Sequence, residues 1–110
     1  MIIIKLWLDD VRPAPEGYVW CKSVNEAKNQ IAECEEMFRC SRSKQFWAIE
    51  LIDIDHDASI YASDGGDYIK LLDWLEETNR NYPIRIHSMN VVGVQNMRRI
   101  IERNGWKEIR

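Results

Sequence analysis

The feature that most constrains the fold is an almost continuously apolar stretch at residues 2–8, Ile-Ile-Ile-Lys-Leu-Trp-Leu, which stops abruptly at Asp9 and Asp10. A short run of this kind is typical of a strand inside a parallel sheet, with both of its faces buried. Two later stretches repeat the arrangement. One is a strand region with its firm part at residues 49–54, which Asp55, His56 and Asp57 follow, and the other is residues 84–88, which ends in the polar residues His87 and Ser88. The chain therefore contains three predicted strands that each end in a polar cluster.

Helical patterns separate these strands. Ser23 and Glu26 have the spacing of a capping box, and apolar residues recur behind them at helical intervals, which predicts a helix over about residues 24–39. Two further helices are predicted over about residues 67–78 and 92–103. The alternation of strands and helices indicates an α/β fold with a mainly parallel sheet.

The segment after the first strand departs from this alternation. Pro13 and Pro15 prevent a helix there, and the β-prone residues 18–21 follow as a short second strand. At the other end of the chain, residues 106–110 either add a last short strand or only dock Trp106 on the core.

Composition limits the classes of protein that fit. A chain of 110 residues forms a single domain over residues 1–110, and its net charge of −3 gives no general attraction to nucleic acid or membranes. Its three cysteines show no Cys-x-x-Cys spacing, which argues for reduced thiols in the cytosol and against a zinc site. No apolar run approaches the ~20 residues that span a bilayer. We therefore expect a cytoplasmic protein without a membrane partner and without sequence-specific DNA recognition.

The polar clusters after the strands are the candidate functional site. Right-handed crossovers place the carboxyl ends of parallel strands at one edge of the sheet, where α/β proteins bind their ligands. Strands lie ~4.8 Å apart, so neighbouring clusters can contact one small ligand. The chain has two histidines in total, and both follow a predicted strand closely. The nine candidate residues are Asp9, Asp10, Arg12, Asp55, His56, Asp57, His87, Ser88 and Asn90.

These side chains suit chemistry on a phosphate ester. His56 and His87 can act as general base and general acid if they flank one reacting centre, and Asp55 or Asp57 can fix the tautomer of either imidazole. The phosphate would be held by a guanidinium fork, by polar side chains and by amides at the start of the last helix, that is, by Arg12, Ser88 and Asn90. Such a set serves either phosphate-ester hydrolysis or phosphate binding.

A metal ion is a further alternative at this edge. Asp9, Asp10 and Asp55 offer an oxygen-rich candidate site for Mg²⁺. The residue types leave open whether a metal, the histidines or both operate.

At these residues the chain resembles the receiver domains of response regulators. The resemblance lies in the acidic pair, the aspartate that ends a middle strand, the Gly66-Asp67 helix entry and Ser88. The chain is more closely similar to the divergent cyclic-phosphate-processing receiver domains. The segments that carry this similarity are Leu8-Asp9-Asp10-Val11-Arg12-Pro13, Asp55-His56-Asp57 and the run from Ile84 to Gly93.

The resemblance implies a three-layer, flavodoxin-like fold in which the first receiver helix is reduced or missing. It also implies hydrolysis of a cyclic phosphate in a nucleotide or RNA end, with the nine residues above as the site. The chain departs from the family pattern in its longer loop over residues 58–66 and in Val91, where a proline is usual.

Two other functions compete with hydrolysis. A signalling receiver would accept phosphate on Asp55, but such receivers also use a lysine at the end of a fifth strand, and Lys107 is poorly placed for this. The third hypothesis is that the chain is a non-catalytic module that binds a nucleotide or a protein.

Overall fold

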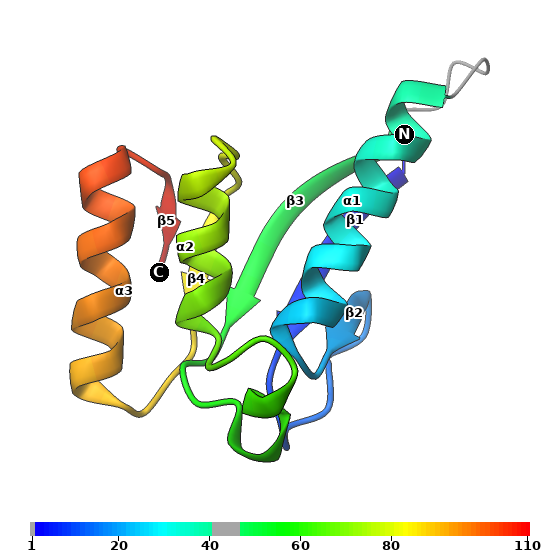
Figure 1. The fold of residues 1–110 in the computed structure, drawn as a ribbon. Helices are drawn as coiled ribbons and strands as arrows, with labels where there is room; N and C mark the ends of the chain where they lie inside the picture. The colour runs from blue at the N-terminus through cyan, green and yellow to red at the C-terminus, as the bar shows by residue number, and fades with distance from the viewer. Residues whose placement is uncertain (1, 41–46) are drawn as a thin grey trace.

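The computed structural model describes residues 2–40 and 47–110, whose five strands form one parallel sheet in the order β2-β1-β3-β4-β5 (Figure 1). The elements are β1 (Ile2–Leu8), β2 (Tyr18–Cys21), α1 (Val24–Cys40), β3 (Trp47–Ile54), the short 3₁₀ helix η1 (Ser59–Ser63), α2 (Ile69–Glu77), β4 (Ile84–Ile86), α3 (Val91–Asn104) and β5 (Glu108–Ile109). This strand order is that of flavodoxin-like folds. The predicted receiver-like α/β fold with a parallel sheet is therefore confirmed.

The predicted helix ends form through local hydrogen bonds. Ser23 Oγ accepts the N–H of Glu26 at 3.1 Å, and the Glu26 carboxylate accepts the N–H of Lys22 at 2.8 Å. At α3, the N–H of Gly93 donates to Asn90 Oδ1 at 2.9 Å, and Gly105 ends the helix with a left-handed φ of 67°. The helices thus begin and end where their short-range sequence signals predicted.

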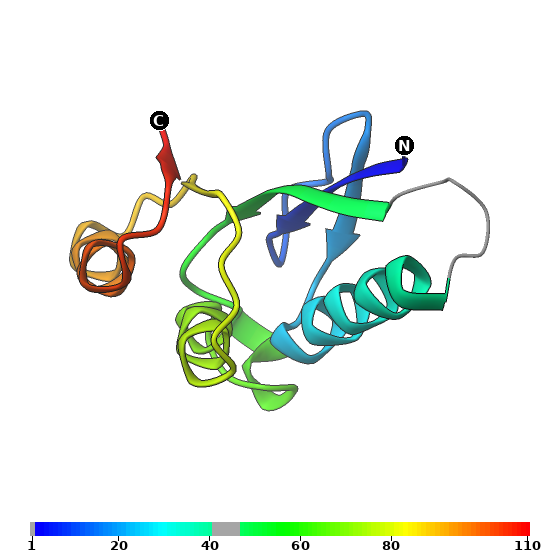
Figure 2. The same ribbon diagram turned by 90° about the horizontal axis from the view of Figure 1, so that it is seen from above.

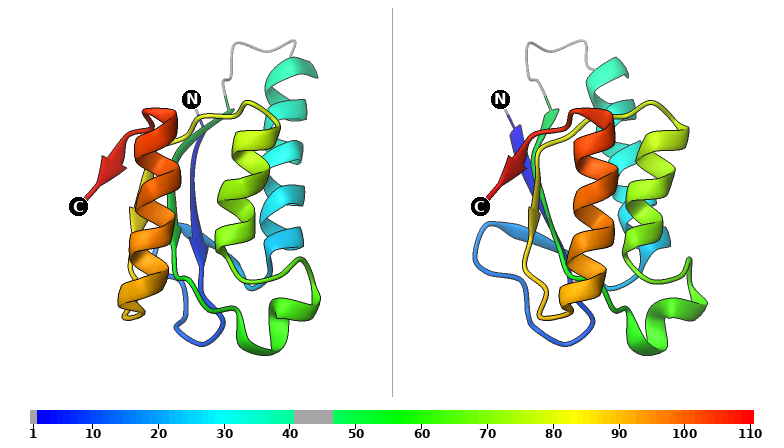
Figure 3. Two further views of the ribbon diagram at one scale, coloured as in Figure 1. Left: turned by 60° about the vertical axis from the view of Figure 1, so that its left-hand side comes forward. Right: turned by 90° about the vertical axis from the view of Figure 1, so that its left-hand side faces the viewer.

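All three helices lie on one side of the sheet, as Figures 2 and 3 show. The described helices therefore cover one face of the sheet, and the first receiver helix is missing between β1 and β2, as the resemblance implies. The physical reason lies in the connections, because the segment between β1 and β2 contains two prolines and passes over the other face without forming a helix.

The alternation of side chains along each strand follows this one-sided cover. Leu6, Leu8, Ile52, Ile54 and Ile84 face the helices and are fully buried in the core. On the opposite face, Ile3 is half exposed, and Lys5, Trp7 and Arg85 are partly or fully exposed. The expectation that β1 is buried on both faces is thus wrong, because no described helix covers its second face.

The carboxyl ends of the three central strands meet in register. The N–H of Asp55 donates to Leu8 O at 2.9 Å, and the N–H of His87 donates to Ile54 O at 3.0 Å. These backbone bonds hold the polar segments after β1, β3 and β4 side by side. The C-terminal segment both adds a strand and contributes to the core. Strand β5 pairs with β4, and Trp106 is buried in the core.

Two further findings bear on the composition. No helix among residues 2–40 and 47–110 is long and apolar enough to cross a lipid bilayer. Cys21 and Cys34 are buried free thiols, and Cys40 is an exposed one.

A polar cluster away from the sheet edge connects α1 to the segment before β4. Glu35 accepts two hydrogen bonds from Arg80, at 2.8 and 3.0 Å, and one from the hydroxyl of Tyr82 at 2.6 Å. The Arg80 guanidinium lies over the ring of Trp74, 4.4 Å from its centroid. The hydrogen bonds from Arg80 hold the pKa of Glu35 below its usual value, although burial opposes the shift.

We predict that Glu35→Gln lowers the free energy of unfolding by about 1–2 kcal/mol at pH 7, since a charged hydrogen-bonded pair is lost. A depressed carboxyl pKa contributes stability above its unfolded value and loses it as the pH falls through the folded value. The difference in the free energy of unfolding between Glu35→Gln and wild type should therefore be smaller at pH 3 than at pH 7. Urea unfolding at both pH values measures it. Glu36→Gln is the control, because the contacts of Glu36 are exposed, with Arg39 at 3.6 Å and with the Cys40 thiol at 3.1 Å. Equal losses in both variants would contradict the prediction.

Candidate functional site

The site begins at Asp9, which is buried at the end of β1. One carboxylate oxygen accepts the backbone N–H groups of Val11 and Arg12 at 2.9 and 2.8 Å, and so closes the turn after the strand. The other oxygen lies 3.0 Å from Arg12 Nε. Arg12 Nη2 lies 3.2 Å from Asp55 Oδ2, so one guanidinium bridges the ends of β1 and β3.

These contacts determine the ionisation of Asp9. Burial on its own would raise the pKa of this carboxyl. The N–H groups of Val11 and Arg12, the bond to His87 and the nearby guanidinium together outweigh burial and hold the pKa below its usual value. Asp9 is therefore a buried, ionised carboxylate at neutral pH.

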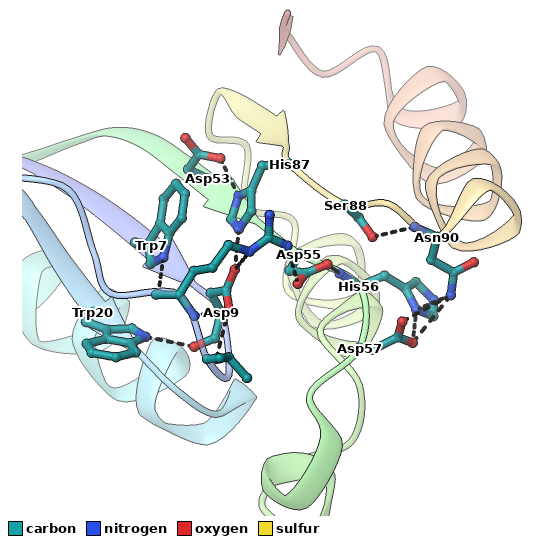
Figure 4. Close-up of polar contacts among 12 residues, drawn as sticks. Trp7, Asp9, Trp20, Asp53, Asp55, His56, Asp57, His87, Ser88 and Asn90 are labelled. Atoms are coloured by element: carbon teal, nitrogen blue, oxygen red, sulfur yellow. Dashed lines mark hydrogen bonds and ion pairs between the residues drawn. The ribbon is translucent and has the colours of Figure 1, made fainter.

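His87 lies between two carboxylates on the uncovered face of the sheet (Figure 4). Its Nδ1 is 2.6 Å from Asp53 Oδ1, and its Nε2 is 3.0 Å from Asp9 Oδ2. Trp7 stacks on the imidazole, with centroids 3.9 Å apart and planes 4° from parallel. A neutral imidazole has one N–H, so both contacts are hydrogen bonds only if His87 carries two protons or one carboxyl is protonated. The His87 ring is therefore positioned by a carboxylate on each side.

Sequence reasoning missed Asp53 and Trp7 as site residues. Only part of the signal lies in the sequence, where alternation along β3 places Asp53 on the face opposite to Ile52 and Ile54. The register then aligns Trp7 with Asp53 across neighbouring strands. Asp53 is a polar residue inside an apolar run, and its burial in the folded protein requires a partner.

His56 belongs to a second group of contacts, at the start of α3. Its Nδ1 lies 2.9 Å from Asp57 Oδ1, and Asn90 Nδ2 lies 3.3 Å from Asp57 Oδ2 and 3.4 Å from His56 Nδ1. The hydrogen bond from His56 is the main reason that the pKa of Asp57 lies below its usual value. Because Asn90 also caps α3, its side chain fixes this pair relative to the helix.

The imidazole of His56 packs directly on the first turn of α3. A Cβ added to Gly93 would lie 2.5 Å from His56 Cγ and 2.6 Å from Cδ2. Glycine is thus required at this position for space. Within the described chain, Nε2 of His56 makes no hydrogen bond, which leaves this nitrogen available to a ligand.

The structure divides the predicted residues into two groups on either side of Asp55 (Figure 4). One group contains Asp9, Arg12 and His87, and the other contains His56, Asp57 and Asn90. Asp55 connects them, because its Oδ1 accepts the N–H of His56 at 2.7 Å while its Oδ2 contacts Arg12. The imidazole of His56 extends towards Asn90, on the side away from His87.

The other two candidates lie beside these groups. Ser88 Oγ accepts the N–H of Asn90 at 3.1 Å, which orients the loop before α3. Asp10 follows Asp9 in the chain but belongs to neither hydrogen-bonded group.

Among the residues that the structure describes, two sets of side chains could hold a metal ion. Ligand atoms of Asp9, Asp55 and His87 lie within 4.8 Å of one another, so His87, rather than Asp10, completes the first set. The second set contains His56, Asp57 and Asp67 at the same spacing. Carboxylate oxygens suit Mg²⁺, but those of Asp9 and Asp55 already contact the Arg12 guanidinium. A metal ion at the first set would therefore compete with Arg12.

The receiver-type lysine has no equivalent at this edge among the described residues. Lys107 O accepts the N–H of Ile84 at 2.9 Å, which places Lys107 level with the beginning of β4. Its side chain lines a hollow with Lys5 and Pro83, towards the amino ends of the strands.

We predict that Gly93→Ala displaces the His56 ring, since the added methyl group and the imidazole cannot occupy the same space. Alanine favours a helix by about 1 kcal/mol relative to glycine, so the substitution should not unfold α3. A loss of the His56–Asp57 contact would therefore come from the displaced ring and not from a loss of helix. The measurement is the ¹⁵N spectrum of the His56 ring, with Val92→Ala as a control on the exposed part of the same turn. An unchanged His56 spectrum would refute the steric argument.

A second prediction concerns Asp53, whose side chain is 1% exposed, whereas that of Asp57 is 58% exposed. Asp53→Asn should lower the free energy of unfolding by about 2 kcal/mol, because His87 loses a buried charged partner. Asp57→Asn is the matched control, and its effect should be less than half as large. Urea denaturation measures both, and similar losses would show that burial does not determine the strength of the pair.

The chain matches the model of one known protein family. No curated protein and no solved structure gave a significant match. The family model described as "Cyclic-phosphate processing Receiver domain" matches residues 4–103, which include every residue of both groups. The chain therefore belongs to the cyclic-phosphate-processing receiver domain family.

Proposed function

We propose that the protein is a phosphoesterase that hydrolyses a cyclic phosphate in a nucleotide or at an RNA end. The observation that carries the proposal is the Asp57–His56 pair, which is fixed on the first turn of α3 beside an arginine that is held by two carboxylates. Family membership supports chemistry on cyclic phosphates but does not by itself establish hydrolysis.

The phosphate would lie between Arg12 and the start of α3. Arg12 is half exposed, and its Nη1 makes no hydrogen bond within the described residues, so it can donate to a phosphate oxygen. Ser88 Oγ accepts a hydrogen bond, which leaves its hydroxyl proton free to donate. The first N–H groups of α3 add donors and the positive end of the helix dipole. Asn90 contributes by fixing Asp57, rather than by a free amide.

His56 is the general base in this scheme. The Nδ1–H group of His56 donates a hydrogen bond to Asp57, which leaves the lone pair on Nε2. Nε2 takes a proton from water as the water oxygen attacks phosphorus.

His87 is the general acid. The bond between phosphorus and one ribose oxygen breaks, and the proton on His87 Nε2 passes to that oxygen. In-line displacement requires the attacking and leaving oxygens on opposite sides of phosphorus, which suits two histidines on either side of Asp55. Trp7 and Asp53 hold the ring of His87 for this step.

The acidic edge would repel a phosphate unless its charge is offset. Arg12 offsets part of it through its contacts with Asp9 and Asp55. Mg²⁺ at Asp9 and Asp55 would have to displace Arg12 from these carboxylates, and it would then supply positive charge next to the phosphate in its place. Turnover should then depend on Mg²⁺ and on the same two aspartates.

The test is turnover of 2′,3′-cyclic and 3′,5′-cyclic nucleotides, with Mg²⁺ and with EDTA. We expect His56→Ala and His87→Ala each to lower kcat by about 100-fold or more, the usual contribution of general acid–base catalysis. Lys70→Ala is the surface control, because Lys70 is exposed on α2. Circular dichroism verifies that each variant is folded.

Other outcomes would replace the proposal. Turnover that is unchanged in both histidine variants would exclude the two-histidine mechanism. No turnover together with labelling of Asp55 by acetyl phosphate would favour a signalling receiver, and nucleotide binding without either reaction would favour a non-catalytic module.

A further inference from the structure

A hollow of about 360 Å³ lies beside the candidate site, between the end of β4 and α3. This volume falls in the range of small-molecule sites. The side chains that line the hollow come from two neighbouring elements and the loop between them: Ile86, Ser88, Val91, Val94, Gln95 and Arg98. No carboxylate is among them, which separates the hollow from the acidic edge next to it.

Ser88 joins the hollow to the phosphate position. Its hydroxyl group faces the loop before α3, where it accepts the N–H of Asn90. Two further hollows of the described chain lie elsewhere, one lined by Cys34 and Tyr82 and one by Lys5 and Lys107. A group attached to a phosphate near Ser88 would therefore enter this hollow.

The lining has the chemistry of a site for a flat heterocycle. Ile86, Val91 and Val94 supply apolar surface, and Gln95 supplies an amide that can both donate to and accept from a base edge. Arg98 adds a planar guanidinium, which Glu108 holds at 2.9 Å from its Nε. Glu108 offsets the charge of Arg98. The flat face of the Arg98 guanidinium is therefore better suited to stacking on a base than to binding a second phosphate.

We propose that this hollow, which we call the β4–α3 pocket, binds the nucleobase of the substrate and that Gln95 reads its edge. The proposal rests on the proposed function, and it adds that the substrate is a nucleotide with its base beside α3. The base can come from a mononucleotide or from the last residue of an RNA.

Filling the pocket tests the proposal. Gln95→Trp should lower kcat/KM for 2′,3′-cyclic nucleotides at least 10-fold and leave hydrolysis of glycerol 1,2-cyclic phosphate, which has no base, unchanged. Glu102→Trp is the matched control, because Glu102 is exposed in a later turn of the same helix and does not line the pocket. Equal losses on both substrates, or no loss on either, would overturn the base site. Gln95→Ala should in addition change the ranking of the four bases.

A mononucleotide and a four-residue RNA with the same terminal base distinguish the two sources. A similar loss with both, in Gln95→Trp, supports a site for the terminal base. A loss confined to the RNA would overturn it, since Gln95 would then contact an upstream residue.

Binding gives a readout that does not depend on hydrolysis. Nucleoside 3′-monophosphates should shift the methyl resonances of Ile86 and Val94, whereas ribose 3-phosphate should not. If these shifts occur without turnover of any cyclic phosphate, the proposed function fails but the base site stands. If both compounds shift the methyl groups equally, or neither does, the base site fails whatever the activity.

Discussion

The arrangement of the site depends on one buried carboxylate, that of Asp9. It closes the turn after β1 with two backbone N–H groups, contacts the Arg12 guanidinium and receives the imidazole of His87. A buried charge is stable only when several partners satisfy it, and here each partner comes from a segment that carries part of the site. The same contacts that keep Asp9 ionised therefore position Arg12 towards Asp55 and hold the ends of β1 and β4 together.

The one-sided cover of the sheet decides where the chemistry can occur. Trp7, Asp53 and His87 lie on the face of the sheet without helices. If a helix covered this face, the same positions would belong to an apolar core. The stacked indole shields the Asp53–His87 pair from water there, which strengthens its electrostatic interaction. The proline-containing segment after β1 thus removes a helix and makes room for a histidine between two carboxylates.

The opposite part of the site uses helix capping for a second purpose. Asn90 caps α3 and at the same time donates to Asp57, so the orientation of His56 depends on where the helix begins. The absence of a side chain at Gly93 lets the imidazole lie on the first turn. Helix α3 therefore carries the donors for the phosphate, positions the proposed general base His56 and forms one wall of the β4–α3 pocket. A change in its first turn would disturb all three.

The sequence by itself determined the elements, their order, the caps of α1 and α3 and the edge at which the polar residues gather, because these follow from local periodicity and from the handedness of crossovers. Only the tertiary structure decided that one face of the sheet lacks helices, that Asp53 and Trp7 join His87, and that the histidines belong to separate groups. These features depend on which residues far apart in the sequence become partners, and a single sequence does not encode such pairings in any local pattern.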